Sequence, residues 1–292
     1  MFKRFAILSV VTAMFLCGGL AADEPSGSHL LDEIHNALDS GEIEPLQAVR
    51  RYRLAARRYR RDGALAGEAL FSAGVVYEKM GRLSDAAGAY HSIISDYPGS
   101  IWFMPAVDAL IESGEKILDE AEKGLFSGGF HRVRRIFSTL ADVELPPEQK
   151  AFVRYKMGVS AMKAGRPAEA EFDFNNVLDA YPVEPWKEKS YFSLGEVYAG
   201  RARRPPRDQS HTRKAIAHFE SFISMYPGSG LRGDAEKYLR DLGERKAEYL
   251  YQICDFYYRR GEKDAFDVYH GLLAAKYPET SWAALASEQF EF

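Results

Sequence analysis

The sequence has little cysteine and no excess of positive charge. Two cysteines among 292 residues form neither a disulfide scaffold nor a four-thiolate zinc site. A formal net charge of −4 argues against a nucleic-acid binder that depends on an overall basic field. Thirteen prolines and 24 glycines are too few for a disordered or collagen-like chain. The composition therefore indicates an ordered protein of one or two domains, or a repeat array.

Motifs that carry catalytic or cofactor chemistry are also missing. The seven histidines include no His-x-x-x-His pair and have no cysteine nearby. The sequence contains no Gly-x-Ser-x-Gly, phosphate loop, dinucleotide fingerprint or EF-hand spacing. We expect that the protein is not an enzyme and that it holds no cofactor and no metal ion. The alternative is an envelope enzyme whose active site lacks a recognisable motif.

The N-terminus has the pattern of an export signal. A basic start, Met1–Arg4, precedes the uncharged stretch Phe5–Leu16, which is too short to span a bilayer of about 30 Å. Small residues and then polar ones follow. We predict a signal peptide over residues 1–22 and a short linker over 23–28. Because no second apolar stretch occurs, the mature protein is expected to be exported and not to cross a membrane.

Cys17 leaves two processing routes open. It ends the apolar run and precedes Gly18, as a lipid-modified cysteine does in bacterial lipoproteins, but Leu16 before it is not a small residue. Cleavage after Ala22 would instead remove Cys17. Cys254 would then be the single thiol, and in an oxidising compartment a lone thiol is best kept buried.

The body of the chain contains a repeat. Four Tyr-Pro dipeptides end at Pro98, Pro182, Pro227 and Pro278. Counting back from these prolines, a small residue, a glycine, an alanine and an aromatic recur 24, 17, 12 and 8 positions upstream. This is the tetratricopeptide pattern, in which small residues let two helices approach, an aromatic fills the space beside them and proline ends the second helix. We interpret these residues as structural, for example Gly74, Gly81, Ala86 and Tyr90 in one unit, and Gly158, Gly165, Ala170 and Phe174 in another.

The repeats predict an all-α tetratricopeptide-repeat solenoid of about six helical hairpins plus a C-terminal capping helix from Ser281. Residues 29–142 form N-terminal repeats, of which 29–60 is degenerate and 102–142 fits loosely around a Gly128-Gly129 turn. Residues 143–292 form C-terminal repeats with an insertion at 201–211. Stacked hairpins bury their apolar faces against each other and leave a concave surface lined mainly by the first helix of each hairpin.

Seven arginines crowd one predicted helix near the start of the repeats. One interpretation is a solvated helix face that carries its apolar residues inward, namely Val49, Tyr52, Leu54 and Ala56. Alternatively, the arginines bind anionic headgroups or an acidic partner segment, because guanidinium groups pair with phosphate and carboxylate. The seven are Arg50, Arg51, Arg53, Arg57, Arg58, Arg60 and Arg61.

A stripe of apolar residues follows the fifth position of the first helices, which borders the groove in this repeat class. It could hold an extended apolar peptide, or its aromatics could pack against the next hairpin. The candidate groove residues are Phe71, Val75, Tyr155, Val159, Phe192 and Tyr251.

The C-terminal half has a further, more specific pattern. The run Arg207–Ser210 opens a helix that closes with Met225–Ser229, a long helix over 234–260 leads to Phe256–Gly261, and Lys276–Thr280 closes the pattern. This order resembles the BamD lipoprotein family, the tetratricopeptide component of the machinery that inserts β-barrel proteins into the bacterial outer membrane. The resemblance is good over about 185–285, fair over 45–100 and poor over 102–142.

The resemblance implies a lipid-anchored or soluble solenoid on the periplasmic side of the outer membrane. It implies that the N-terminal repeats meet unfolded barrel substrates and that the C-terminal repeats dock the periplasmic domains of the barrel insertase. A membrane surface, reached through Cys17, is a further implied partner. The alternative is another exported tetratricopeptide adaptor of the cell envelope, such as a peptidoglycan-synthesis coordinator. Carried onto this chain, the candidate docking residues are Arg207, Asp208, Tyr257, Tyr258 and Arg259.

Overall fold

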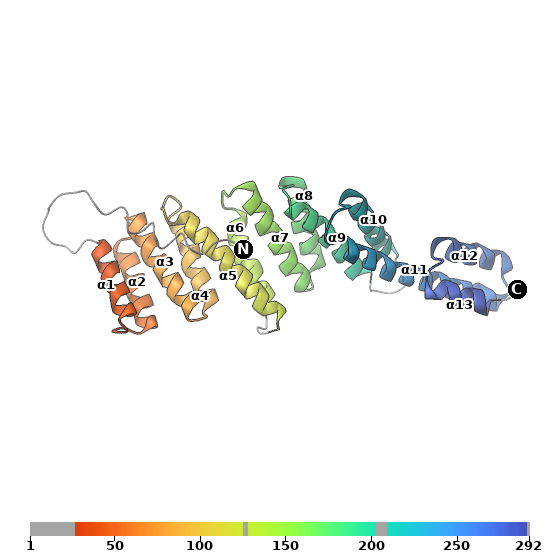
Figure 1. The fold of residues 1–292 in the computed structure, drawn as a ribbon, viewed down its shortest axis with the longest axis horizontal. Helices are drawn as coiled ribbons and strands as arrows, with labels where there is room; N and C mark the ends of the chain where they lie inside the picture. The colour runs from red at the N-terminus through yellow and green to blue at the C-terminus, as the bar shows by residue number, and fades with distance from the viewer. Residues whose placement is uncertain (1–26, 125–127, 203–208, 291–292) are drawn as a thin grey trace.

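A computed structural model describes residues 27–124, 128–202 and 209–290, and these residues form thirteen α-helices and no strand (Figure 1). Six antiparallel hairpins and a last helix follow each other along one long axis, which confirms the predicted solenoid. The predicted signal peptide and Cys17 lie outside the described residues. The hairpins are α1 (Gly27–Asp39) with α2 (Pro45–Arg58), α3 (Gly63–Lys79) with α4 (Leu83–Asp96), α5 (Phe103–Glu122) with α6 (Gly129–Ala141), α7 (Pro147–Lys163) with α8 (Pro167–Ala180), α9 (Trp186–Arg201) with α10 (Ser210–Met225), and α11 (Arg232–Arg260) with α12 (Lys263–Lys276), before α13 (Ser281–Gln289).

The repeat residues end the helices where the sequence predicts. We call the first helix of each hairpin its A helix and the second its B helix. Gly81, Gly165 and Gly261 follow the A helices α3, α7 and α11 with φ of +71°, +72° and +68°, a conformation that favours glycine. Four B helices stop at the tyrosine of a Tyr-Pro pair, because proline disfavours the helical conformation in the residue before it.

The glycines inside the A helices are needed for close packing against B helices. A Cβ on Gly74 would lie 2.4 Å from the Tyr90 ring, and one on Gly158 would lie 2.6 Å from Phe174. Gly114 in α5 has the same relation to Phe137 in α6, at 2.9 Å. Residues 102–142 therefore form a hairpin that packs like the other repeats. The glycine and the aromatic are 23 residues apart in this hairpin and 16 apart in the Gly74 unit.

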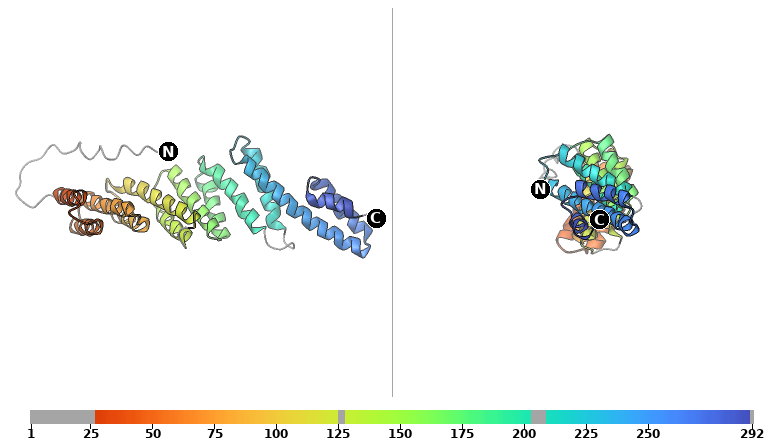
Figure 2. Two further views of the ribbon diagram at one scale, coloured as in Figure 1. Left: turned by 60° about the horizontal axis from the view of Figure 1, so that its bottom comes forward. Right: turned by 90° about the vertical axis from the view of Figure 1, so that its right-hand side faces the viewer.

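The long helix α11 connects the body of the solenoid to its C-terminal end. Its first half packs through Ala235 and Leu242 against α9 and α10, and its second half packs through Leu250 and Cys254 against α12 and α13. Figure 2 shows this helix reaching out to the terminal unit. Cys254 is fully buried, as expected, and burial raises the pKa of its thiol to about 11.

Successive A helices touch each other more closely than successive B helices do. The pairs α1–α3, α3–α5, α7–α9 and α9–α11 are in contact, whereas contacts between neighbouring B helices are sparse in the described ranges. Such spacing curves a stack of hairpins so that the A helices lie on its inner side. This agrees with the predicted concave surface. None of the helices in the described ranges is long and apolar enough to cross a membrane.

Candidate functional site

Three of the four fifth-position aromatics of the A helices are covered by tryptophans. The ring centroids of Phe71 and Trp102 are 4.9 Å apart, those of Tyr155 and Trp186 are 5.5 Å apart, and those of Tyr251 and Trp282 are 5.1 Å apart. Each tryptophan follows its partner by 31 residues and stands at the start of the helix that covers the hairpin. All three tryptophans of the chain are used in this way. The stripe is thus first of all a contact between consecutive hairpins.

Phe192 departs most from the expected groove. It is only 7% exposed and packs edge-on against Phe219 and Phe222, so its side chain presents no surface to a peptide. Its place in the predicted groove is corrected to a core position. The remaining groove candidates, Phe71, Val75, Tyr155, Val159 and Tyr251, keep part of their surface exposed.

Polar contacts between consecutive A helices run beside these aromatics. The side chains in these contacts pair with each other across neighbouring A helices. They hold the A helices in register and make the inner surface polar at intervals. Burial raises the pKa of the Glu196 carboxyl, although hydroxyl groups donate to it. The contacts are Lys116 to Glu78 (3.8 Å, α5 to α3), Lys156 to Glu115 (2.8 Å, α7 to α5) and the Tyr238 hydroxyl to Glu196 (3.0 Å, α11 to α9).

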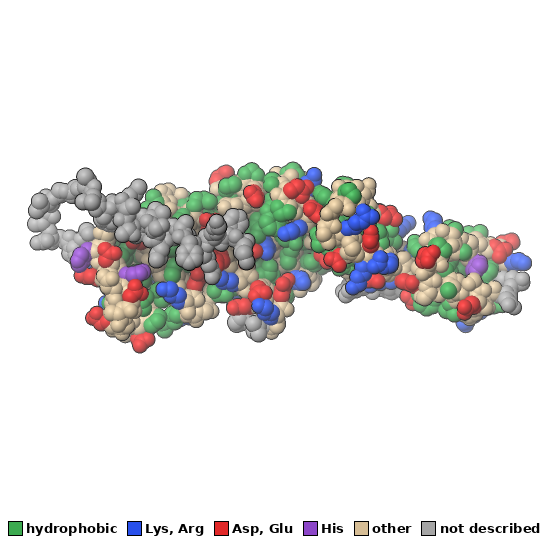
Figure 3. Space-filling view, viewed as in Figure 1, with side chains coloured by type: hydrophobic (Ala, Val, Ile, Leu, Met, Phe, Trp, Pro, Cys, Tyr) green, Lys and Arg blue, Asp and Glu red, His purple; other side chains and the backbone are tan. Residues whose placement is uncertain are grey.

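A buried charge cluster joins the B helices α6 and α8 to α7. The side chain of Asp173 is fully buried and accepts a hydrogen bond from the guanidinium of Arg134, while Arg154 lies 3.7 Å away. Arg134 also pairs with Glu169 at 2.9 Å and donates to the Met157 carbonyl at 3.1 Å. The cluster fixes three helices at the middle of the solenoid, where Figure 3 shows hydrophobic side chains at the surface among acidic and basic ones.

The predicted docking residues of the C-terminal unit divide into inner and outer ones. Tyr257 stacks on Tyr269 at 5.6 Å, and Tyr258 packs against Phe266 and against Phe290, which follows α13. Arg259 points outward with 73% of its side chain exposed. The other two candidates, Arg207 and Asp208, fall outside the described part of the chain.

An exposed apolar stripe on α12 was not predicted from the sequence. Val268 is 60% exposed and Leu272 is 37% exposed, and Gly271 and Ala275 beside them are exposed too. These residues follow helical spacing and lie opposite Phe266 and Leu273, which face the core. The signal that could have revealed this surface is that α12 has apolar residues on both faces. We call Val268, Gly271, Leu272 and Ala275 the α12 stripe.

Every arginine of the predicted basic patch faces the solvent. All seven arginines from Arg50 to Arg61 are exposed, on α2 or in the turn that follows it. Val49, Tyr52 and Ala56 face the core as expected. Leu54 does not, because it is 62% exposed on the arginine side of the helix, and this corrects the predicted inward face.

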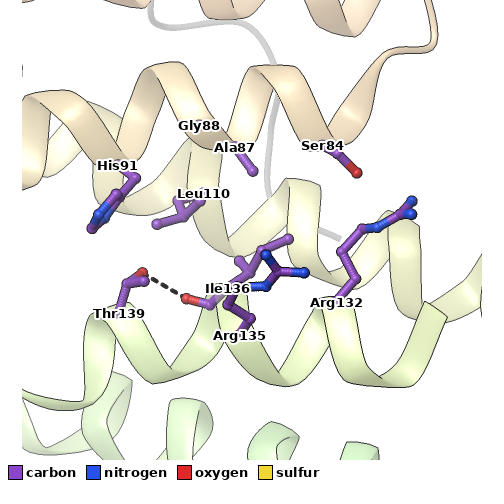
Figure 4. A pocket seen from close by; sticks show the side chains of 9 residues that line it. All are labelled: Ser84, Ala87, Gly88, His91, Leu110, Arg132, Arg135, Ile136 and Thr139. Atoms are coloured by element: carbon purple, nitrogen blue, oxygen red, sulfur yellow. Dashed lines mark hydrogen bonds between the residues drawn. The ribbon is translucent and has the colours of Figure 1, made fainter. Parts of the chain in front are cut away.

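A pocket opens between the B helices α4 and α6, where their wider spacing uncovers α5. Its volume is ≈ 440 Å³. Figure 4 shows Leu110 and Ile136 in its middle, His91 and Thr139 at one end, and Arg132 toward the other. An apolar floor with guanidinium groups at its side suits an apolar side chain next to a carboxylate. In the described part of the chain, no cluster of three His, Cys, Asp or Glu side chains is arranged to hold a metal ion.

The fold and these surfaces define the class as a tetratricopeptide-repeat solenoid, and residues 68–100 match a tetratricopeptide-repeat family. Residues 112–290 match the YfiO family, described as outer membrane lipoprotein. Because this match covers more than half of the chain, the protein belongs to the YfiO outer membrane lipoprotein family. This confirms the BamD resemblance seen in the sequence. The match includes residues 112–142, where we expected the resemblance to be poor, and does not extend over 45–100, where we expected a fair one.

The chain is also similar to solved structures, at low identity. PilF of Pseudomonas aeruginosa is 12% identical with a TM-score of 0.36, covering 90% of this chain and 97% of its own. PilW, a type IV pilus biogenesis factor, is 13% identical with a TM-score of 0.35, covering 91% and 100%. A tetratricopeptide repeat protein from Parabacteroides merdae is 14% identical with a TM-score of 0.39, covering 87% and 94%.

Proposed function

We propose that the protein is a non-enzymatic scaffold in the assembly of outer-membrane β-barrel proteins, which binds unfolded barrel segments and docks the barrel insertase. The observation that carries this proposal is the match to an outer membrane lipoprotein family over residues 112–290, from α5 to α13. Tetratricopeptide solenoids present long surfaces of stacked helices, which suits the binding of extended or helical partner segments.

The α12 stripe is the docking surface that the structure supports best. In a solenoid, the outer face of one hairpin is normally covered by the next, but α13 packs on the opposite side through Ala286 and leaves the stripe open. A patch of exposed apolar side chains at the end of a solenoid is suited to a partner protein. Arg259, which is exposed near the end of α11 and pairs with Asp255 at 3.0 Å, would add a charged contact to the partner.

Unfolded barrel segments would bind along the inner face. The exposed edges of Phe71, Tyr155 and Tyr251, with Val75 and Val159, supply apolar contact, and the lysine–glutamate pairs between the A helices lie among them. An unfolded strand alternates apolar and polar side chains, so a surface that alternates in the same way suits it.

The experiment is affinity purification of the tagged full chain from membranes, with the variant Val268→Glu/Leu272→Glu beside the native protein. We expect the double variant to recover at least about tenfold less insertase, because two carboxylates would be buried at the contact. The matched control is Ile101→Glu/Met225→Glu, which changes two exposed apolar residues elsewhere, in the turn before α5 and at the end of α10, 77% and 50% exposed. Equal recovery of the insertase by the native protein and the stripe variant would contradict the docking surface.

Recovery of cell-wall synthases in place of an insertase would favour the peptidoglycan-synthesis alternative. Intact mass of the mature chain would show whether Cys17 is lipidated.

A further inference from the structure

The outward face of α2 combines arginines with exposed leucines. Leu46 and Leu54 are 41% and 62% exposed. Eight residues apart, they lie about 12 Å apart along the helix and within about 80° around it. Arg50 and Arg57 lie on the same side, opposite the buried Ala48 and away from the buried Tyr52. We call Leu46, Arg50, Arg53, Leu54 and Arg57 the basic face of α2.

The positive charge of this region is not neutralised from within the fold. Six of the seven arginines, all but Arg58, make no ion pair or hydrogen bond through their side chains with the residues that the structure describes. The nearest following carboxylate, Asp62, is engaged as the N-cap of α3, where it accepts from the amides of Ala64 and Leu65. The guanidinium groups are therefore available to a partner.

The partner has to satisfy both the charge and the two leucines. Exposed leucine side chains cost free energy in water. A partner that buries Leu46 and Leu54 while it contacts the arginines would therefore lower the free energy of this face. An acidic peptide would pair with the arginines but needs a groove to enclose apolar side chains, and the α2 face is the convex side of one helix. A bilayer surface accepts a convex helix, because leucines enter the acyl boundary while arginines reach the phosphates.

We propose that the basic face of α2 binds the surface of an anionic phospholipid bilayer. Leu46 and Leu54 insert between the headgroups, and Arg50, Arg53 and Arg57 contact phosphates. The B helix of the first hairpin would then lie on the membrane, and the solenoid would extend from it toward α13. This contact does not depend on the docking of an insertase, so either proposal can fail without the other.

The test is co-sedimentation of the full chain with vesicles of phosphatidylcholine alone and of phosphatidylcholine with roughly one third phosphatidylglycerol. Using the full chain keeps any contribution of the N-terminal segment equal in every variant. We expect binding to the anionic vesicles to be stronger and to weaken with salt. Arg50→Gln/Arg53→Gln/Arg57→Gln should weaken it by about 100-fold, since one basic residue at an anionic surface contributes about fivefold.

The matched control is Arg213→Gln/Arg240→Gln/Arg245→Gln, which removes the same charge from exposed arginines of α10 and α11 and should leave binding unchanged. Leu54→Ser should weaken binding, whereas Ile101→Ser, at a more exposed apolar residue outside this face, should not. Circular dichroism would check that each variant folds. Equal binding to both vesicle types, or an equal loss in the two arginine triples, would overturn the proposal. Binding of a polyglutamate peptide that requires the α2 arginines, without vesicle binding, would reassign the face to an acidic protein partner.

Discussion

Trp102 lies on the ring of Phe71, with the two ring centroids 4.9 Å apart, and the same contact recurs twice more in the chain. In each case the aromatic belongs to an A helix and the tryptophan begins the helix that follows the hairpin. The fourth A helix with an aromatic at this position, α9, has Leu231 in the packing cluster at the start of the next A helix. A large apolar residue at the start of one hairpin therefore closes the previous one.

Removing one of these tryptophans should open a hairpin junction. For Trp102→Ala we expect a loss of about 2 kcal/mol in the free energy of unfolding, less than for a fully buried tryptophan because Trp102 is partly exposed. The neighbouring Ile101→Ala, at a residue 77% exposed, should change it by less than about 0.5 kcal/mol. Urea unfolding followed by circular dichroism measures both. Equal effects of the two substitutions would contradict the role of the tryptophan.

Glycines of the chain should divide into two classes when changed to alanine. At Gly158 a Cβ would collide with the Phe174 ring at 2.6 Å, so Gly158→Ala should destabilise the fold by about 2 kcal/mol. At Gly88, inside α4, a Cβ would meet nothing within 4 Å, so Gly88→Ala should stabilise it by up to about 1 kcal/mol through helix propensity. Thermal and urea unfolding of both variants check the signs. A destabilised Gly88→Ala or a neutral Gly158→Ala would refute the assignment.

The parts of the fold that could be predicted are those fixed by local spacing. Gly74 and Tyr90 are 16 residues apart in a unit of standard turn length, so the repeat pattern identifies both. Gly114 and Phe137 make the same contact across 23 residues, and the longer turn hides them from a search at fixed spacing. Packing of the fifth-position aromatics against the next hairpin was one of the two expectations, but the repeat pattern did not identify the tryptophans as their partners.

The candidate site was less predictable because exposure depends on which face a neighbour covers. The α2 helix has apolar residues on both sides, and sequence alone did not show that Leu54 lies among the arginines. The pairing of Arg134 with Asp173 spans 39 residues and three helices, and no period in the sequence connects them. Similarly, the α12 stripe is recognisable only once α13 is seen to pack elsewhere.

The buried charge cluster should be much more sensitive than a surface ion pair. Arg134→Met would leave the buried Asp173 with Arg154 as its nearest cation, and we expect it to cost about 3 kcal/mol of unfolding free energy. Arg82→Met breaks the exposed pair with Asp85, whose N···O distance is 2.7 Å, and should cost less than about 1 kcal/mol. Urea unfolding of both variants tests the contrast. A small effect at Arg134 would mean that Arg154 alone compensates Asp173.

The junction between α9 and α10 should respond to pH through His218. Its ring stacks on Tyr191 with centroids 4.0 Å apart, and its Nε2–H donates to the Tyr191 carbonyl at 2.8 Å. Burial lowers the pKa of the imidazole below its ordinary value of 6.5, an effect that the hydrogen bond opposes. The unfolded chain therefore binds the proton more readily than the folded one.

It follows that the stabilisation linked to His218 is fully present above about pH 6.5 and is lost as the pH falls through the lowered folded pKa. In His218→Phe, which keeps a stacked ring but does not titrate, the free energy of unfolding should fall less between about pH 7 and pH 5 than in the native protein. At neutral pH the variant should be less stable by about 1 kcal/mol, because the Tyr191 carbonyl loses its donor. Urea unfolding across this pH range measures both quantities. Identical pH slopes for the two proteins would show that His218 titrates alike in the folded and unfolded chain.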